Sequence, residues 1–197
     1  MKLFSIVFLL WIPIFVGNPV ISMQGIKIAD SEQVVNNISL DVVAFEEKKG
    51  AKYFKYSTEN GNDFTLTIEK VKVVYLENDW LHDKSGNKPL ITNFVFGETT
   101  LKDIRAAFGT NGFAYKEHAF LSLEKDLITF NCFELDSPND EILVIATKIP
   151  FSTTGLTEGN VAENFKLEAI ILSNKKYLNK IWGKEKAYDG NFKKIKL

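Results

Sequence analysis

The sequence predicts an α+β fold that consists mainly of an antiparallel β-sheet with two short helices, at about residues 100–108 and 174–182. Apolar and polar residues alternate in several short segments, which is the pattern of strands with one buried face. Short polar connections separate consecutive segments and favour antiparallel pairing. Helical spacing of apolar residues between capping residues is found in only these two places.

The alternation predicts strands at residues 38–45, 51–56, 64–68, 71–75, 113–123, 127–135, 141–149 and 165–172. The turn-forming residues Glu59–Asn62 predict a hairpin between the second and third of these strands. The alternation shifts by one residue after Lys70, and this shift predicts a bulge or bend near Glu69 and Lys70. Short connections after residues 123 and 135 predict that the next strands form an antiparallel meander.

The first predicted helix has Thr100 as its N-cap and ends at Gly109. Its apolar face consists of Leu101, Ile104 and Phe108. Lys102 and Arg105 fall outside that face. The second predicted helix is capped by Ser173 and ends at Gly183. Its apolar face consists of Tyr177, Leu178, Ile181 and Trp182.

The N-terminus has the pattern of a cleavable secretory signal. Lys2 supplies a positive charge, residues 3–17 form an apolar run shorter than a membrane span, and cleavage is predicted after Ser22. An uncleaved anchor is the alternative. The expected organisation is a signal peptide at 1–22, a polar lead-in at 23–37, a single α+β domain at 38–183 and a Lys-rich tail at 184–197.

Composition excludes several classes of function. The net charge is -1 and the isoelectric point is about 6.2, so the chain lacks the basic footprint of a nucleic-acid-binding protein and has no general attraction to anionic membranes. Stable membrane insertion is not expected once the signal is cleaved. Cys132 is the single cysteine, which excludes an intramolecular disulfide. It lies in an apolar strand pattern and is expected to be a small buried residue.

The segment Gly97–Gly109 reads Gly-Glu-Thr-Thr-Leu-Lys-Asp-Ile-Arg-Ala-Ala-Phe-Gly. It resembles the Gly-x-Thr-Thr helix signature of the BamE/SmpA and beta-lactamase-inhibitor-like group of small exported proteins. The resemblance implies a non-enzymatic protein that binds other envelope proteins through the exposed face of its sheet. This chain departs from the group because it has no lipid-attachment cysteine and because predicted strands fill residues 38–76.

The favoured hypothesis for function is an exported, non-enzymatic protein-binding module, such as an envelope assembly factor or an inhibitor. Its partner would be another envelope or secreted protein, and no cofactor or catalytic residue is predicted. The candidate contact residues are Trp80, Leu81, Tyr115 and Phe120. Trp80 could instead fold back over the core. Tyr115 and Phe120 have opposite parity in one predicted strand, so at least one of them is expected to face the core.

The alternative hypothesis is an exported small-ligand-binding or metal-binding protein, or a hydrolase, with its site near the polar loop at residues 78–89. Long loops in compact domains frequently carry function. Within this loop, His82 lies between Asp79 and Asp83, and a histidine with two carboxylates can bind a metal ion. The spacing of these three residues matches no established ligand pattern.

Overall fold

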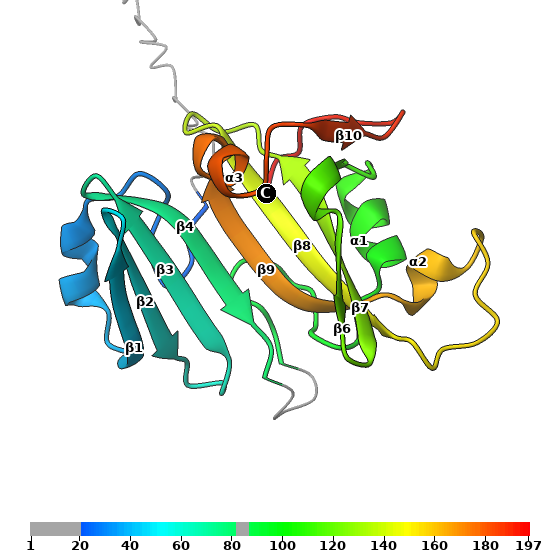
Figure 1. Ribbon diagram of the computed structural model, residues 1–197, viewed down its shortest axis with the longest axis horizontal. Coiled ribbons are helices and arrows are strands. Elements are labelled where there is room, and N and C mark those ends of the chain that lie inside the picture. Colours follow the sequence, from blue (N-terminus) through cyan, green and yellow to red (C-terminus); the bar gives the residue numbers. More distant parts are fainter. Residues whose placement is uncertain (1–20, 82–86) are drawn as a thin grey trace, which may run out of the picture.

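The computed structural model describes residues 21–81 and 87–197. In these residues, ten strands form one antiparallel sheet, with helices at its faces and ends (Figure 1). The strands lie in the order β1-β2-β3-β4-β9-β8-β7-β5-β10, and β6 pairs with β7. Two of the described helices have seven or more residues. The predicted α+β class, mainly antiparallel sheet with two short helices, is therefore confirmed.

The strands are β1 (Asp41–Lys48), β2 (Ala51–Ser57), β3 (Asp63–Glu69), β4 (Lys72–Asp79), β5 (Phe113–Tyr115), β6 (Phe120–Leu123), β7 (Asp126–Glu134), β8 (Glu141–Pro150), β9 (Lys166–Asn174) and β10 (Lys186–Tyr188). The helices are α1 (Leu101–Phe108), α2 (Val161–Asn164) and α3 (Lys175–Ile181), and the 3-10 helices are η1 (Glu32–Asn37) and η2 (Lys116–His118).

The centre of the sheet is buried on both faces. Successive residues of a strand point to opposite faces, so in β9 the side chains of Ile170 and Leu172 lie in one core and Ile171 lies in the other. Helix α1 adds Ile104 to the first core, and α3 adds Leu178 to the second. The two longer helices therefore cover opposite faces of the same sheet.

Both ends of the described region pack against the sheet. Met23 and Ile26 are buried in the same core as α1, and Ile195 pairs with Leu135. Residues that the sequence predicted as a polar lead-in and a Lys-rich tail thus contribute apolar side chains to the core. The predicted signal segment lies almost wholly outside the described residues and stays a prediction. None of the described helices is long and apolar enough to cross a membrane.

The predicted hairpin between β2 and β3 is confirmed by their antiparallel register, in which Tyr56 lies opposite Phe64. The predicted bulge or bend near Glu69 and Lys70 is a hairpin turn, from which the chain returns as β4, and the irregularity in the β3–β4 register lies between Thr67 and Ile68. Lys70 and Val71 both have positive φ, as the two central residues of a tight hairpin turn do. This turn has no glycine or asparagine, which is why no turn signal is visible in the sequence.

The predicted strand at 113–123 is divided into β5 and β6 by the helical turn η2. Phe113 lies opposite Cys132 and Phe120 lies opposite Thr129 on the same strand, β7. Seven residues of chain therefore span a length that three residues of β7 span, and the surplus leaves the sheet as η2. The predicted meander through the strands at 113–123, 127–135 and 141–149 is confirmed by the antiparallel registers of β6 with β7 and of β7 with β8.

The first predicted helix is confirmed as α1, with Thr100 as its N-cap and Gly109 in the left-handed conformation at its end. The second helix differs in detail from the prediction. Its N-cap is Asn174, whose side chain accepts hydrogen bonds from two backbone N–H groups, whereas Ser173 donates its hydroxyl to the Val74 carbonyl. Ile181, predicted on the apolar face, is exposed.

Trp80 forms part of the packing around the start of β9. Its indole stacks on Phe96, with ring centroids 6.4 Å apart and ring planes within 7°. The backbone N–H of Trp80 donates to the Glu168 carbonyl, and that of Gly97 donates to the Leu167 carbonyl. Gly97 has a φ of 72°, and a Cβ atom at this position would overlap the Trp80 ring.

We expect Gly97→Ala to lower the free energy of unfolding by about 2–4 kcal/mol, because it combines an unfavourable backbone conformation with overpacking against Trp80. Gly155→Ala is the matched control, since Gly155 has a φ of 73° with open space at its Cβ position. It should cost only about 1–2 kcal/mol, for backbone strain alone. Urea unfolding of both variants measures the difference, and equal losses would contradict the proposed overlap.

Candidate functional site

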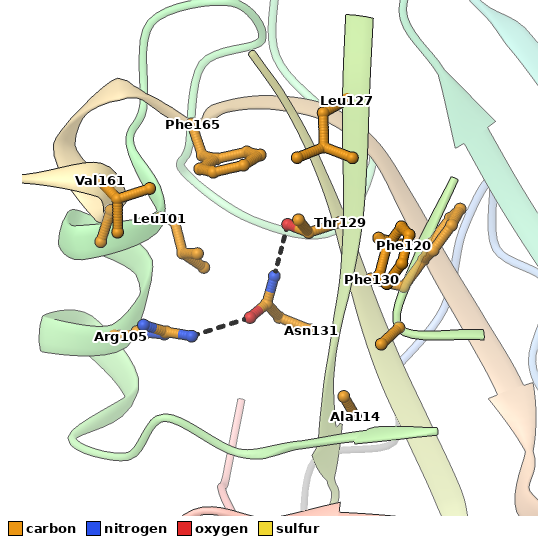
Figure 2. Close-up of a pocket in the computed structure, with 12 residues that line it drawn as sticks. Leu101, Arg105, Ala114, Phe120, Leu127, Thr129, Phe130, Asn131, Val161 and Phe165 are labelled. Atoms are coloured by element: carbon orange, nitrogen blue, oxygen red, sulfur yellow. Dashed lines mark hydrogen bonds between the residues drawn. The ribbon is translucent and has the colours of Figure 1, made fainter. Parts of the chain in front are cut away.

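A mainly apolar pocket of about 450 Å³ lies on the α1 face of the sheet, between α1 and α2 on one side and β6 and β7 on the other. We call it the α1–β7 pocket (Figure 2). Its helical wall is formed by Leu101, Val161 and Phe165. Phe120 stands at the opposite side, and Leu127 of β7 lies between them. The volume lies in the range of pockets that hold small molecules or a peptide side chain.

The position of α1 relative to the sheet is fixed by its first turn. The hydroxyl of Thr100 accepts a hydrogen bond from the backbone N–H of Asp103, whose carboxylate accepts one from the backbone N–H of Thr100. This reciprocal capping box satisfies two N–H groups that a helix start would otherwise leave unpaired. The backbone N–H of Leu101 then donates to the Phe165 carbonyl at 2.9 Å. The helix start is therefore tied to the segment that enters β9.

Arg105 extends from α1 across the pocket. It lies one helical turn after Leu101, so the two side chains lie on the same side of the helix. Its Nη2 atom donates a hydrogen bond of 3.0 Å to the side-chain oxygen of Asn131 on β7 (Figure 2). Its Nε atom is buried and has no hydrogen-bond partner among the described residues. Arg105 also forms no ion pair with a carboxylate in residues 21–81 and 87–197.

A row of polar side chains crosses the floor of the pocket. The side-chain nitrogen of Asn131 donates to the Thr129 hydroxyl at 3.1 Å, and the Thr129 hydroxyl is 2.9 Å from that of Thr147 on β8. The hydrogen bond from Asn131 to Thr129 leaves the Asn131 oxygen facing the guanidinium of Arg105. The row therefore holds one edge of the guanidinium in place.

The electrostatic environment of Arg105 is that of a partly buried cation. Burial lowers the pKa of its guanidinium from the usual value, and the charge of Asp189 acts in the opposite direction. An arginine in a protein remains protonated even so. Asp189 itself accepts a hydrogen bond from the backbone of Asn191. The positive charge at the pocket is thus only partly compensated by its surroundings.

The structure separates the four predicted contact residues. Trp80 is half-buried and packed on Phe96, as in the alternative that it folds back over the core. Leu81, beside it, is 42% exposed. Tyr115 is fully buried, and its hydroxyl donates to Asn179, so it is a core residue rather than a contact residue. Phe120 is 66% exposed and lines the α1–β7 pocket.

The predicted metal-binding group is only partly described. His82 and Asp83 lie outside the described residues, and Asp79 is the last residue of β4. Asp79 lies opposite Asp63 in the β3–β4 register. Burial and then the charges of Glu77 and Asp63 raise the pKa of the Asp79 carboxyl to about 8. In the described part of the chain, no three histidine, cysteine or acidic residues are arranged to hold a metal ion.

The other histidine, His118, and the cysteine, Cys132, both take part in packing. His118 stacks on Trp182, with ring centroids 4.5 Å apart, and burial lowers its pKa. It lies in η2, whereas the sequence placed it within a strand. Cys132 is fully buried, and burial raises the pKa of its thiol. The expectation that Cys132 is a small buried residue is confirmed.

Sequence reasoning missed Arg105, which it placed outside the apolar face of the helix. The available signal was the four-residue spacing from Leu101, which puts a cation beside an apolar side chain. Asn131 was missed as well, because it stands 26 positions further along the chain and nothing local connects it to the helix. The polar pair Thr129 and Asn131 within an otherwise apolar strand pattern was the second signal.

No protein-family model matches the chain, and no match is found among curated proteins. Two solved structures are similar to it. One is an extracellular protein containing an SCP domain from Bacillus anthracis, with 11% identity, a TM-score of 0.44, and coverage of 84% of this chain and 50% of that one. The other is a cysteine-rich secretory protein from Staphylococcus aureus, with 11% identity, a TM-score of 0.49, and coverage of 91% and 55%.

The chain thus spans about half the length of the two solved structures that it matches. Both proteins are named as extracellular or secretory. The resemblance of Gly97–Gly109 to the BamE/SmpA and beta-lactamase-inhibitor-like group is wrong, because the matching structures belong to a different group. The segment has the local structure that the signature describes, a capped helix ended by glycine.

We expect the stability of the chain to decline with pH through the titration of Asp79. Its pKa is raised to about 8 in the folded protein, compared with about 3.9 in an unfolded chain. The folded state therefore binds this proton more tightly, and the resulting stability is full below about pH 4 and is lost as the pH rises through about 8. Asp79→Asn should reduce the fall in melting temperature between these pH values.

Thermal unfolding followed by circular dichroism at a series of pH values measures this effect. Asp41→Asn is the control, because Asp41 lies exposed on the edge strand β1. It should leave the pH dependence close to that of the parent chain. A melting temperature that falls equally steeply with pH in Asp79→Asn and in the parent would contradict the assignment of the proton to Asp79.

Proposed function

We propose that the chain is an exported, non-enzymatic protein-binding module that receives an apolar segment of another envelope or secreted protein at the α1–β7 pocket. The observation that carries this proposal is the exposure of Phe120 beside an apolar pocket. Leu121 and Leu123, on the opposite face of the same strand, and Phe151 beyond β8 are exposed as well, so this end of the sheet is rich in exposed apolar side chains. Export is supported by the signal pattern at residues 1–22.

Exposed apolar surface next to a pocket is a common feature of protein-binding sites. Single exposed apolar residues are normal on a protein surface, whereas a group of large ones marks an interaction surface. Aromatic side chains are enriched at such surfaces, and a few anchors that fill pockets provide most of the binding energy. Phe120 and the pocket together have this arrangement of an aromatic residue beside an apolar recess.

The chemical character of the pocket also favours binding over catalysis. Apart from Arg105, its lining consists of apolar side chains and the amide and hydroxyl of Asn131 and Thr129. The Thr129 hydroxyl is hydrogen-bonded to the Thr147 hydroxyl and the Asn131 amide. Neither of these groups is a general base that could activate it as a nucleophile. The lining supplies apolar area and a few fixed polar groups, as a recognition site requires.

The proposal predicts a position-specific contact. A photo-crosslinking amino acid in place of Phe120 should yield a discrete adduct with a partner protein in the envelope or medium of the producing cells, because this side chain would lie at the interface. The control position is Phe45, also a phenylalanine, which is 55% exposed on the edge strand β1 at the other end of the sheet. Adducts are separated by electrophoresis and identified by mass spectrometry.

Phe120→Ala should remove the adduct formed from a second probe placed at Ser122, which is exposed and points to the same face of β6 as Phe120, while leaving the melting temperature within a few degrees of the parent. The small change in stability is expected because Phe120 is mostly exposed already. Equal labelling from positions 120 and 45, or no adduct from either position 120 or position 122, would overturn the proposed binding surface.

A further inference from the structure

We propose that the α1–β7 pocket recognises the free C-terminal carboxylate of an apolar peptide segment, with Arg105 binding the carboxylate and the apolar walls receiving the last side chain. This proposal rests on the proposed function and specifies the chemistry of the partner. It requires a cation that is held in position, that lacks a counter-ion of its own, and that borders an apolar recess. Each requirement is met by described residues of the pocket.

Arg105 is held in position but only partly used. A guanidinium has five N–H donors in a planar fork, which matches the two oxygens of a carboxylate. The hydrogen bond to Asn131 is made by Nη2, and the buried Nε has no partner among the described residues. A buried donor without an acceptor is costly, and a turn of the guanidinium that offers Nε and an Nη atom to an incoming carboxylate would remove that cost.

The charge distribution around the pocket favours an anion. Arg105 is the one charged side chain among the residues that line the pocket as described. Other charges on the helices beside it are paired elsewhere: Lys102 of α1 forms an ion pair with Glu163 of α2 at 2.6 Å. Asp189 acts on Arg105 through its charge but does not form an ion pair with it. No acidic side chain in the lining would repel a carboxylate.

The size and walls of the pocket favour a chain terminus over an internal acidic residue. In a C-terminal residue, the carboxylate and the side chain are attached to the same Cα atom, so both can enter one pocket of about 450 Å³. Leu101, Leu127 and Phe165 offer apolar surface to that side chain, within the same recess that Arg105 borders. Phe120 at the rim then offers a contact to the preceding residue.

The test compares two probes that differ only in charge. N-acetyl-leucyl-phenylalanine carries a free carboxylate, and its C-terminal amide is the neutral counterpart. We expect the purified chain to bind the acid at least about tenfold more tightly than the amide, because hydrogen bonds to charged groups are the strong ones. Nuclear magnetic resonance titration gives both affinities and shows whether the affected amides are those of α1, β6 and β7.

Arg105→Met should reduce the preference for the acid to within about twofold, since it removes the charge and keeps an apolar stem of similar length. Arg105→Gln is the second variant, in case the first fails to fold, because its side chain can still donate a hydrogen bond to Asn131. Lys102→Met is the matched control, because Lys102 lies on the same helix, exposed, and outside the pocket. It should leave the preference unchanged.

Several outcomes would overturn the proposal. Equal affinity for acid and amide would mean that the pocket accepts apolar groups without reading a carboxylate. Binding of decanoate, but not of the peptide acid, in an Arg105-dependent manner would assign the pocket to a lipid-like amphiphile. Absence of binding by either peptide would remove carboxylate recognition while leaving the Phe120 cross-linking result to decide the protein-binding function. Acid-specific binding without any Phe120 adduct would instead remove the protein partner.

Discussion

The alternation of side chains along β8 and β9 is the constraint on which the remaining structure depends. From Glu141 to Thr147, every residue of β8 is buried, and neighbouring residues belong to different cores. A strand buried on both faces needs cover on each side. Helix α1 and the N-terminal segment provide it on one face, and α3 provides it on the other. The two short helices are therefore placed where the sheet requires them.

Local sequence signals predicted the elements that local interactions stabilise. Helix α1 was predicted because its ends are determined by nearby residues. Thr100 and Asp103 cap its N-terminus, and Gly109 ends it. The turn at Lys70 and Val71 was missed because pairing of β3 with β4 imposes positive φ on residues that do not favour it. The division of the 113–123 segment was missed for a similar reason, since it follows from the register against β7 and not from the segment itself.

The candidate site was harder to predict because its residues come together only through packing. Phe120 was identified from its sequence pattern, but its exposure depends on β6 lying beside β7 alone. Tyr115 has the same aromatic character and is fully buried, because β5 lies between β7 and β10 and is covered by Trp182. That Arg105 belongs to a site follows only from the position of α1 opposite β7, where Arg105 donates to Asn131. Composition and spacing indicate the chemistry of each residue, whereas strand order and register determine which distant residues are in contact.

The pocket itself follows from the way two short helices cover one long strand. On the α1 face of β7, Phe133 packs edge-on against Phe108 at a centroid distance of 4.8 Å, and Leu127 packs beside Phe165 at the other end. Between these two contacts the strand presents the polar side chains of Thr129 and Asn131. Arg105 reaches into this gap because a polar floor can hydrogen-bond its guanidinium.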